Sequence, residues 1–197
     1  MALTSLHSAD NALAQEHERL LLGLARASIR HGLSKGNPLP VDLTTLPTEL
    51  TVKCATFVTL EKRGELRGCI GCLEALRPLA VDIATNAYAA AFRDSRFPPV
   101  SPNEIDELEI RISLLTPAEP IAFSSEADLL SQLVPGEDGL ILEEGSQRGT
   151  FLPSVWESLP EPGEFLRHLK RKAGLPADYW SNSLKVYRYR SHTIGKR

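Results

Sequence analysis

The sequence predicts an α+β protein in which two hairpin–helix–strand units share one antiparallel sheet, with helices packed on it. The first observation is a repeated order of elements, because signals for a hairpin, a helix and a strand follow one another twice at an offset of about 80 residues. The second observation is the stretch 108–114, where apolar and polar residues alternate with the period of a half-buried strand. Hairpins followed by helices favour an antiparallel sheet covered by helices on one face.

A long helix is expected before the first unit, over residues 8–31. Ser8 or Asp10 can cap it, and apolar residues then recur at the spacing of a helical face. Gly32 is expected to end this helix. Residues 33–50 contain three prolines among polar residues, which predicts a loop.

The first repeated unit is expected at about residues 51–116. Gly64 in the turn can adopt a positive φ, as a tight hairpin requires. Paired prolines at 98–99 must follow the helix rather than continue it. The predicted elements are, in order, a strand at 53–60, a turn at 61–64, a strand at 65–70, a helix at 78–92 and a strand at 108–114.

The second repeated unit is expected at about residues 139–190. A short helix at 125–133 precedes it, with Ser125 and Asp128 at the spacing of a capping box. No flexible linker separates the two units, so we expect residues 1–197 to form a single domain. The predicted elements are a hairpin of 140–142 with 150–152, a helix at 163–173 that Gly174 ends, and a strand at 184–189.

Composition indicates a globular protein of the cytoplasm. Apolar residues make up 42% and charged residues 24% of the 197, close to the averages of folded domains. The first ten residues show no export signal, and no stretch is apolar enough to span a membrane. Three cysteines are too few for a disulfide scaffold, so we interpret them as reduced thiols.

Charge is distributed unevenly along the chain. The net charge is −3, but residues 101–161 carry 13 acidic and 2 basic side chains, whereas residues 163–197 carry 9 basic and 2 acidic ones. In one interpretation, the acidic middle and the basic end lie beside each other in the fold. In the other, the basic end is a docking surface for an acidic or phosphate-rich partner, nucleic acid included.

The stretch Leu66–Gly71 contains the residues most suited to chemistry. Arg67 and Cys69 lie two apart in a predicted strand, so their side chains share a face, and a guanidinium beside a thiol favours the reactive thiolate. Gly68 and Gly71 flank this cysteine and would leave room for a ligand to reach the backbone. The competing interpretation is a small buried cysteine in a tightly packed strand.

Cys69 and Cys72 also form a C-x-x-C pair, which is a weak signal by itself. A structural zinc site needs four ligands, and no second pair is present. Redox dithiols favour a helix N-terminus, whereas the nearest predicted helix begins at Pro78. The chain also lacks phosphate-loop, dinucleotide, nucleophile-elbow and H-E-x-x-H motifs, so we expect no metal and no cofactor.

Three polar residues near the alanine-rich helix have a structural and a functional interpretation. Asn86 lies inside that helix, where a buried amide needs partners and is expected to bond a neighbouring strand. Asp94 and Arg96 follow the helix, and they form either a surface turn with a salt bridge or part of a cleft near the strand ends.

The stretch Leu66–Gly71 resembles the hallmark of the AMMECR domain family, known in bacteria and archaea as AmmeMemoRadiSam system protein A. Further stretches match this family in the same order, and together they cover roughly residues 10–190. These stretches are Phe57–Leu60, Asn86–Phe92, Asp94–Val100, Ile112–Pro117, Gly139–Leu142, Phe151–Pro153 and Lys172–Leu175.

The resemblance implies an α+β fold with a duplicated unit, and a functional role for the Arg-Gly-Cys stretch. It also implies a pathway shared with a Memo-like protein, which resembles extradiol dioxygenases, and with a radical S-adenosylmethionine protein. The chain departs from the family pattern at Lys170, a position where family members often have cysteine. Cys72 is an individual feature of this chain, which weakens a C-x-x-C mechanism further.

Two functions follow as hypotheses, and both stay open at this point. In the first, the protein is an enzyme or an enzyme subunit with Cys69 as nucleophile, and Arg67, Asp94 and Arg96 orient an anionic group near it. In the second, it is a non-catalytic module that binds a protein, a nucleic acid or an acidic small molecule. Under either hypothesis we expect Cys54 to be buried and inert, and Cys72 to lack a charged neighbour.

Overall fold

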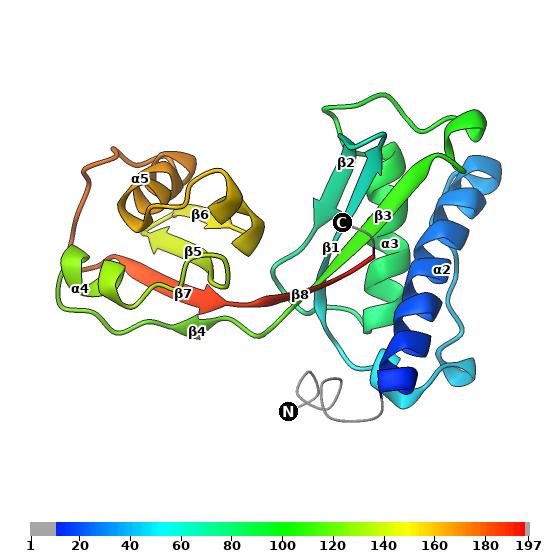
Figure 1. The fold of residues 1–197 in the computed structure, drawn as a ribbon, viewed down its shortest axis with the longest axis horizontal. Helices are drawn as coiled ribbons and strands as arrows, with labels where there is room; N and C mark the ends of the chain where they lie inside the picture. Colours follow the sequence, from blue (N-terminus) through cyan, green and yellow to red (C-terminus); the bar gives the residue numbers. More distant parts are fainter. Residues whose placement is uncertain (1–10, 196–197) are drawn as a thin grey trace. The chain divides into compact units, whose positions relative to one another are not determined.

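The computed structural model describes residues 11–195, with side chains from residue 15 onward, and the chain divides into two compact units (Figure 1). Among the described residues, the first unit comprises 11–115 and 192–195, and the second comprises Thr116–Ser191. Each unit has its own antiparallel sheet and its own apolar core. Among residues 11–195, no helix combines the length and apolar character that crossing a membrane requires.

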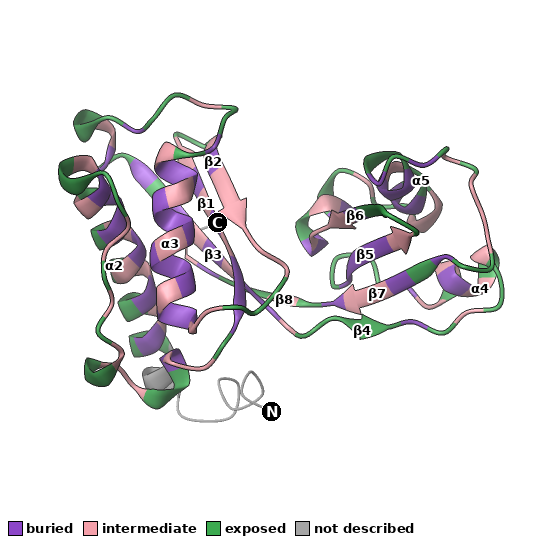
Figure 2. Cartoon of the chain, turned by 180° about the vertical axis from the view of Figure 1, so that it is seen from behind, coloured by how far each residue is buried: buried purple, intermediate pink, exposed green. Residues whose placement is uncertain are grey.

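The first unit has two helices packed on one face of a four-stranded sheet. Helix α3 contacts β1 and β2, whereas α2 contacts α3 and β3. The buried side chains of α3 face this sheet and α2, and the helix is mostly purple in Figure 2. The sheet has the order β2-β1-β3-β8. The elements are α2 Asn11–Lys35, β1 Ala55–Lys62, β2 Glu65–Gly71, α3 Leu79–Phe92, β3 Leu108–Leu115 and β8 Ser191–Ile194, with 3-10 helices at Leu43–Thr45, Thr48–Leu50 and Pro102–Glu104.

The predicted end of the long helix at Gly32 is wrong, because α2 continues to Lys35. A Cβ atom at Gly32 would lie 2.7 Å from Cδ2 of Tyr88 and would also clash with the ring of Phe92, so this glycine serves close packing of α2 on α3. Gly36, at φ 72°, ends the helix instead, and its N–H donates to the carbonyl of Gly32. The predicted caps Ser8 and Asp10 lie outside the described residues.

The hairpin predicted for the first unit is present, but its turn is Arg63–Gly64 rather than residues 61–64, because β1 continues to Lys62. Arg63 and Gly64 both have positive φ, 55° and 82°, as a two-residue turn between β1 and β2 requires. The strand predicted at 108–114 is also present as β3, and its buried residues alternate with partly exposed ones. Hydrophobic period and turn chemistry therefore determine these local structures.

The second unit repeats this plan around its own core. Its sheet has the order β4-β7-β5-β6, and helix α5 contacts β6. In the core the rings of Trp156 and Phe165 stack with centroids 3.8 Å apart. The elements are β4 Glu119–Pro120, α4 Glu126–Ser131, β5 Gly139–Glu144, β6 Gln147–Phe151, α5 Pro162–Lys172 and β7 Lys185–Tyr189, with a 3-10 helix at Pro153–Glu157.

The predicted α+β class with duplicated hairpin–helix–strand units is confirmed, but the prediction of one shared sheet is wrong. Within each unit the third strand pairs with the first strand of the hairpin, giving β2-β1-β3 and β6-β5-β7. In each sheet, the strand at the remaining edge is short and follows the other hairpin–helix–strand unit in the chain. Strand β4, which follows β3, pairs with β7, and β8, which follows β7, joins the sheet beside β3. A single domain over residues 1–197 stays a prediction.

The acidic middle and the basic end of the chain meet within the second unit. Glu126 pairs with Lys170 at 3.1 Å, Asp138 with Arg188 at 3.3 Å, and Glu137 with Arg190 at 3.1 Å. These ion pairs agree with the first interpretation of the charge distribution. Lys170 is fully buried, so it is not part of any basic docking surface.

Candidate functional site

Cys69 lies on β2, on the sheet face that points away from the two helices. Its cross-strand partner is Thr59 on β1, and Thr59 is in turn opposite Arg111 on β3. Residues directly opposite in neighbouring strands share a face, so these three side chains form a row. The adjacent residues Val58 and Leu60 are completely buried on the helix side. Cys69 is partly exposed, and its Sγ lies 3.3 Å from the Thr59 hydroxyl.

The backbone of Cys69 is held by the turn that follows α3. Because β2 is an edge strand, the Cys69 N–H and carbonyl that do not pair with β1 need other partners. The N–H donates to Asp94 Oδ2 at 2.9 Å, and the carbonyl accepts from Arg96 Nη2 at 3.3 Å. The structure therefore brings together three residues that the sequence analysis selected.

Asp94 and Arg96 form a coupled ion pair beside the cysteine. Arg96 donates to both carboxylate oxygens of Asp94, with Nε–Oδ1 and Nη2–Oδ2 distances of 2.9 and 2.7 Å. These side-chain hydrogen bonds are the main reason that the pKa of Asp94 is well below its usual range. The same bonds raise the pKa of Arg96, and electrostatic interaction with Cys69 adds to this effect. Arg96 thus lies beside Cys69, whose carbonyl it contacts.

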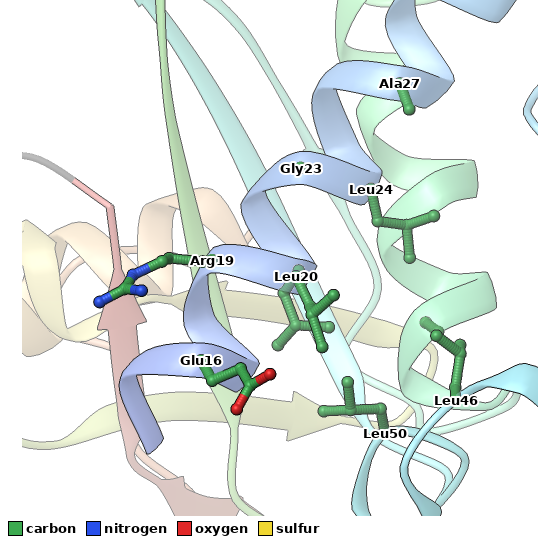
Figure 3. A pocket seen from close by; sticks show the side chains of 10 residues that line it. Glu16, Arg19, Leu20, Gly23, Leu24, Ala27, Leu46 and Leu50 are labelled. Carbon is green, nitrogen blue, oxygen red and sulfur yellow. The ribbon is translucent and has the colours of Figure 1, made fainter. Parts of the chain in front are cut away.

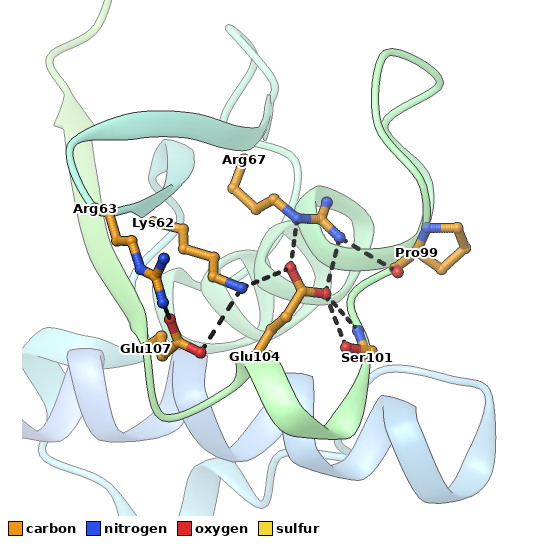
Figure 4. Close-up of polar contacts among 7 residues, drawn as sticks. All are labelled: Lys62, Arg63, Arg67, Pro99, Ser101, Glu104 and Glu107. Atoms are coloured by element: carbon orange, nitrogen blue, oxygen red, sulfur yellow. Dashed lines mark hydrogen bonds and ion pairs between the residues drawn. The ribbon is translucent and has the colours of Figure 1, made fainter.

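Arg67 has a different role from the one expected. Its guanidinium makes a two-bond ion pair with Glu104, through Nε at 3.1 Å and Nη2 at 3.2 Å (Figure 4). The side-chain hydrogen bond from Arg67 is the main reason that the pKa of Glu104 falls to about 2. Lys62 Nζ and the Ser101 backbone N–H also donate to this carboxylate. Arg67 therefore anchors the β1–β2 hairpin to the segment that leads into β3.

The space beside both motif glycines is filled by the protein itself. A Cβ atom at Gly68 would clash with the carbonyl oxygen of Ala90 in α3. A Cβ atom at Gly71 would clash with the carbonyl oxygen of Thr56 and with the ring of Phe57. The expected room for a ligand is therefore occupied, and Gly68 lets α3 lie close on β2.

Asn86 belongs to a buried polar network rather than to an open cleft. Its amide donates to the Thr56 carbonyl at 3.1 Å and to Asp82 Oδ2 at 2.8 Å. Asp82 is completely buried, and its other oxygen accepts from Arg77 Nε at 2.9 Å. The structure thus agrees with the structural interpretation of Asn86. Asp82 was not predicted as part of this network, although an acidic residue four positions before Asn86 on an apolar helix is a visible signal in the sequence.

The three cysteines lie in different environments. Cys54 is buried, and this burial raises its pKa to about 11. Cys72 is partly exposed, and its Sγ accepts from the N–H of Glu74 at 3.4 Å. Cys69 and Cys72 are separated by extended backbone, and three strand residues span about 10 Å, beyond the roughly 4.4–6.8 Å between Cα atoms of a disulfide. This spacing disfavours a Cys69–Cys72 disulfide, and both cysteines are free.

The duplication reveals an internal repeat that the sequence analysis did not find. Gly68 is paired with Leu60, and in the second unit Gly149 is paired with Leu142 in the same hairpin position. Gly-Cys at 68–69 therefore corresponds to Gly-Thr at 149–150, whereas Arg148 lies opposite Glu143 and Arg67 lies at a register shift of β2. A Cβ atom at Gly149 would lie 2.9 Å from the backbone N of Ala173, just after α5, so the second glycine also permits close helix packing.

Comparing the two hairpins distinguishes residues that the fold requires from a residue that occurs in only one unit. The glycine is present in both hairpins and serves close packing, whereas Arg67 anchors its hairpin to Glu104 and Arg148 pairs with Glu143 inside its own hairpin. The position after the glycine holds a partly exposed thiol in one unit, but in the other the Thr150 hydroxyl bonds the Leu140 carbonyl at 2.8 Å. Among the described residues, no group of three or more His, Cys, Asp or Glu side chains is arranged to hold a metal ion.

Known proteins are similar to this chain in sequence and in structure. A family model described as AMMECR1 matches residues 22–194. A protein of Methanothermobacter thermautotrophicus is 41% identical over 187 residues, which cover 91% of this chain and 94% of that protein. A Thermotoga maritima protein is 42% identical over 148 residues, covering 74% and 80% of the two chains. The crystal structure of an uncharacterized protein from Pyrococcus horikoshii has a TM-score of 0.81 and 36% identity, covering 88% of each chain.

Proposed function

The chain belongs to the AMMECR1 family, and we propose that it acts in a cytoplasmic pathway with a Memo-like protein and a radical S-adenosylmethionine protein, using Cys69 as a reactive thiol. The two partner classes follow from the family resemblance. The geometry of the first unit supports the role of the thiol. No metal or cofactor is part of the proposal.

The observation that carries the proposal is the contrast between Cys69 and the position that corresponds to it. Cys69 is partly exposed, whereas Cys54 is buried and has a raised pKa. Its backbone is fixed on both sides by Asp94 and Arg96. The equivalent Thr150 has only structural hydrogen bonds. A fixed, accessible thiol in only one of two matching hairpins supports a function that packing does not explain.

The proposed chemistry is nucleophilic, with the Cys69 thiolate as the attacking group. The Thr59 hydroxyl, 3.3 Å away, donates a hydrogen bond to the thiolate sulfur. Arg96 stabilises the negative charge through space, and Asp94 fixes both Arg96 and the Cys69 N–H. Arg67 acts only by holding the hairpin in place through Glu104.

The test is the rate of alkylation as a function of pH for single variants in which Cys54, Cys69 or Cys72 is replaced by serine. Circular dichroism confirms that each variant is folded. We expect the fastest thiol to disappear only in Cys69→Ser. If Cys69→Ser retains the fastest-reacting thiol, the proposal fails and the motif is a packing device.

A second candidate is a non-catalytic module that binds a protein, a nucleic acid or an acidic small molecule. The observation in its favour is that, within the described chain, the Cys69 thiol is hydrogen-bonded to a threonine hydroxyl, which is no general base at neutral pH. The exposed Arg167, Arg171 and Lys172 supply positive charge for an acidic partner. Binding to the Memo-like protein or to RNA that persists in Cys69→Ser and weakens with salt favours this candidate.

A further inference from the structure

A groove follows one side of α2 in the first unit (Figure 3). Its volume is about 430 Å³, within the range of small binding sites. Leucine and alanine side chains form most of its walls, which come from α2, from residues 46–50 and from the first turn of α3. The apolar residues lining it are Leu20, Leu21, Leu24, Ala27, Leu46, Leu50 and Ala80.

The groove is long rather than compact. On α2 its lining runs from Glu16 to Ala27 at helical spacing. With a rise of 1.5 Å per residue, these positions extend over about 16 Å, or three helical turns. Leu20 is 43% exposed within this lining, which is unusual for a large apolar side chain. A second helix of three turns matches this length.

The packing of the protein does not explain why position 23 is a glycine. Glycine inside a helix lowers stability relative to alanine. A Cβ atom at Gly23 would meet nothing within 4 Å, so no contact inside the protein requires glycine here. Gly32 in the same helix differs, because the rings of Tyr88 and Phe92 fill the space beside it. Gly23 instead leaves the groove open to close approach from outside.

Two charged side chains, Glu16 and Arg19, line one end of the groove. In Figure 3 the Glu16 carboxylate points toward Leu50, whereas Arg19 extends away from the leucines. Glu49, next to Leu50, is exposed. Neither Glu16 nor Glu49 has an ion pair among the residues that the structure describes. An occupant with an apolar body and a basic end therefore complements the groove in both shape and charge.

We propose that this groove binds an amphipathic helix of a partner protein. Aliphatic side chains of that helix, spaced three to four residues apart, would enter between α2 and residues 46–50. Its backbone would cross α2 closely at Gly23, and a lysine or arginine at one end would pair with Glu16. The groove lies on the helix side of the first unit, whereas Cys69 faces the other side of the sheet, so this proposal is independent of the thiol.

The test uses the full chain and two synthetic helical peptides as probes, measured by fluorescence anisotropy. Both peptides have leucines at three- and four-residue spacing, and they differ only in lysine or glutamate at the ends. We expect the lysine peptide to bind at least twofold more tightly, and Gly23→Leu to weaken it at least tenfold. Glu16→Lys should reverse the preference between the peptides. Gly163→Leu, at another helix position with open space, and Glu65→Lys are the matched controls and should change neither affinity.

Stability provides the second measurement. Gly23→Ala should raise the melting temperature while it weakens peptide binding, because only an occupant needs the glycine. A lower melting temperature would show that Gly23 serves the fold, and would overturn the proposal. Equal binding of both peptides, or binding unaffected by Gly23→Leu, would also overturn it. So would a dimer that dissociates in Gly23→Leu, or nuclear Overhauser contacts between Leu24 and residues 1–10, since other occupants would then fill the groove.

Discussion

Replacing Asp94 by asparagine tests whether the turn after α3 holds Cys69 in place. The Asp94 side chain is 4% exposed and accepts four hydrogen bonds, three from Arg96 and one from the Cys69 N–H. Asparagine keeps one acceptor oxygen but replaces the other with an amide NH₂ group, which faces two of the N–H donors. About two of the four hydrogen bonds are therefore lost. Hydrogen bonds to a charged group contribute about 1.5–3 kcal/mol each. Because Arg96 is 55% exposed and solvent screens the pair, we expect the lower end, a loss of about 2–3 kcal/mol in the free energy of unfolding.

The assay is urea denaturation followed by far-ultraviolet circular dichroism, because both tryptophans, Trp156 and Trp180, lie in the second unit. The control is Asp106→Asn. Asp106 pairs with Arg30 at 2.9 Å, but the two side chains are 81% and 58% exposed. Such a surface pair contributes about 0–1 kcal/mol. Equal losses for the two variants would refute the reasoning.

The stability difference between the wild-type protein and Asp94→Asn should change with pH in a defined direction. The pKa of Asp94 in the folded state is lower than in the unfolded state, chiefly because Arg96 donates to the carboxylate. The stability from such a group is complete above its unfolded pKa of about 3.9 and is lost as the pH falls toward the folded pKa. The difference between the wild-type protein and Asp94→Asn should therefore be constant near neutral pH and shrink below about pH 4. A difference that grows in acid would contradict this assignment.

Three further predictions follow from contacts in the first unit. Gly68→Ala should lower the free energy of unfolding by about 1–3 kcal/mol, because its Cβ would press on the Ala90 carbonyl; urea denaturation measures this, and an unchanged midpoint would contradict it. Glu104→Gln should remove about 3 kcal/mol of stability at neutral pH, and the loss should vanish as the pH falls from about 4.5 to 2, through the folded pKa of about 2. Cys54 should be alkylated only after unfolding at any pH below its pKa of about 11, as peptide mapping can check; rapid native labelling would show that its burial is transient.

Local signals in the sequence determine much of the fold. The alternation in β3 and the positive φ of Gly64 are properties of a few neighbouring residues, and both predictions are confirmed. The pairing of sheets is different, because β4 has two residues, Glu119 and Pro120, and no periodic pattern can identify so short a strand. The exchange of β4 and β8 between sheets therefore depends on tertiary contacts, and the prediction of one sheet fails there.

The candidate site also combines features that local sequence predicts with features that depend on tertiary contacts. The sequence selected Cys69, Asp94 and Arg96, and the structure brings them together because the turn after α3 meets the edge of β2. Strand spacing placed Arg67 on the face of Cys69, but spacing says nothing of where a long side chain finds its partner. Glu104 lies 37 residues further along the chain, so their pairing depends on the path between α3 and β3.

The most direct test of the central claim is site-resolved labelling of the native protein with limiting iodoacetamide, followed by peptide mapping. Cys69 should be modified first, and Arg96→Ala should slow its modification about two- to fivefold, as expected for one partly screened charge. Arg93→Ala, which removes an exposed arginine three residues away, should leave the rate unchanged. Modification of Cys72 before Cys69, or equal rates in the two arginine variants, would contradict the assignment of Cys69 as the reactive thiol.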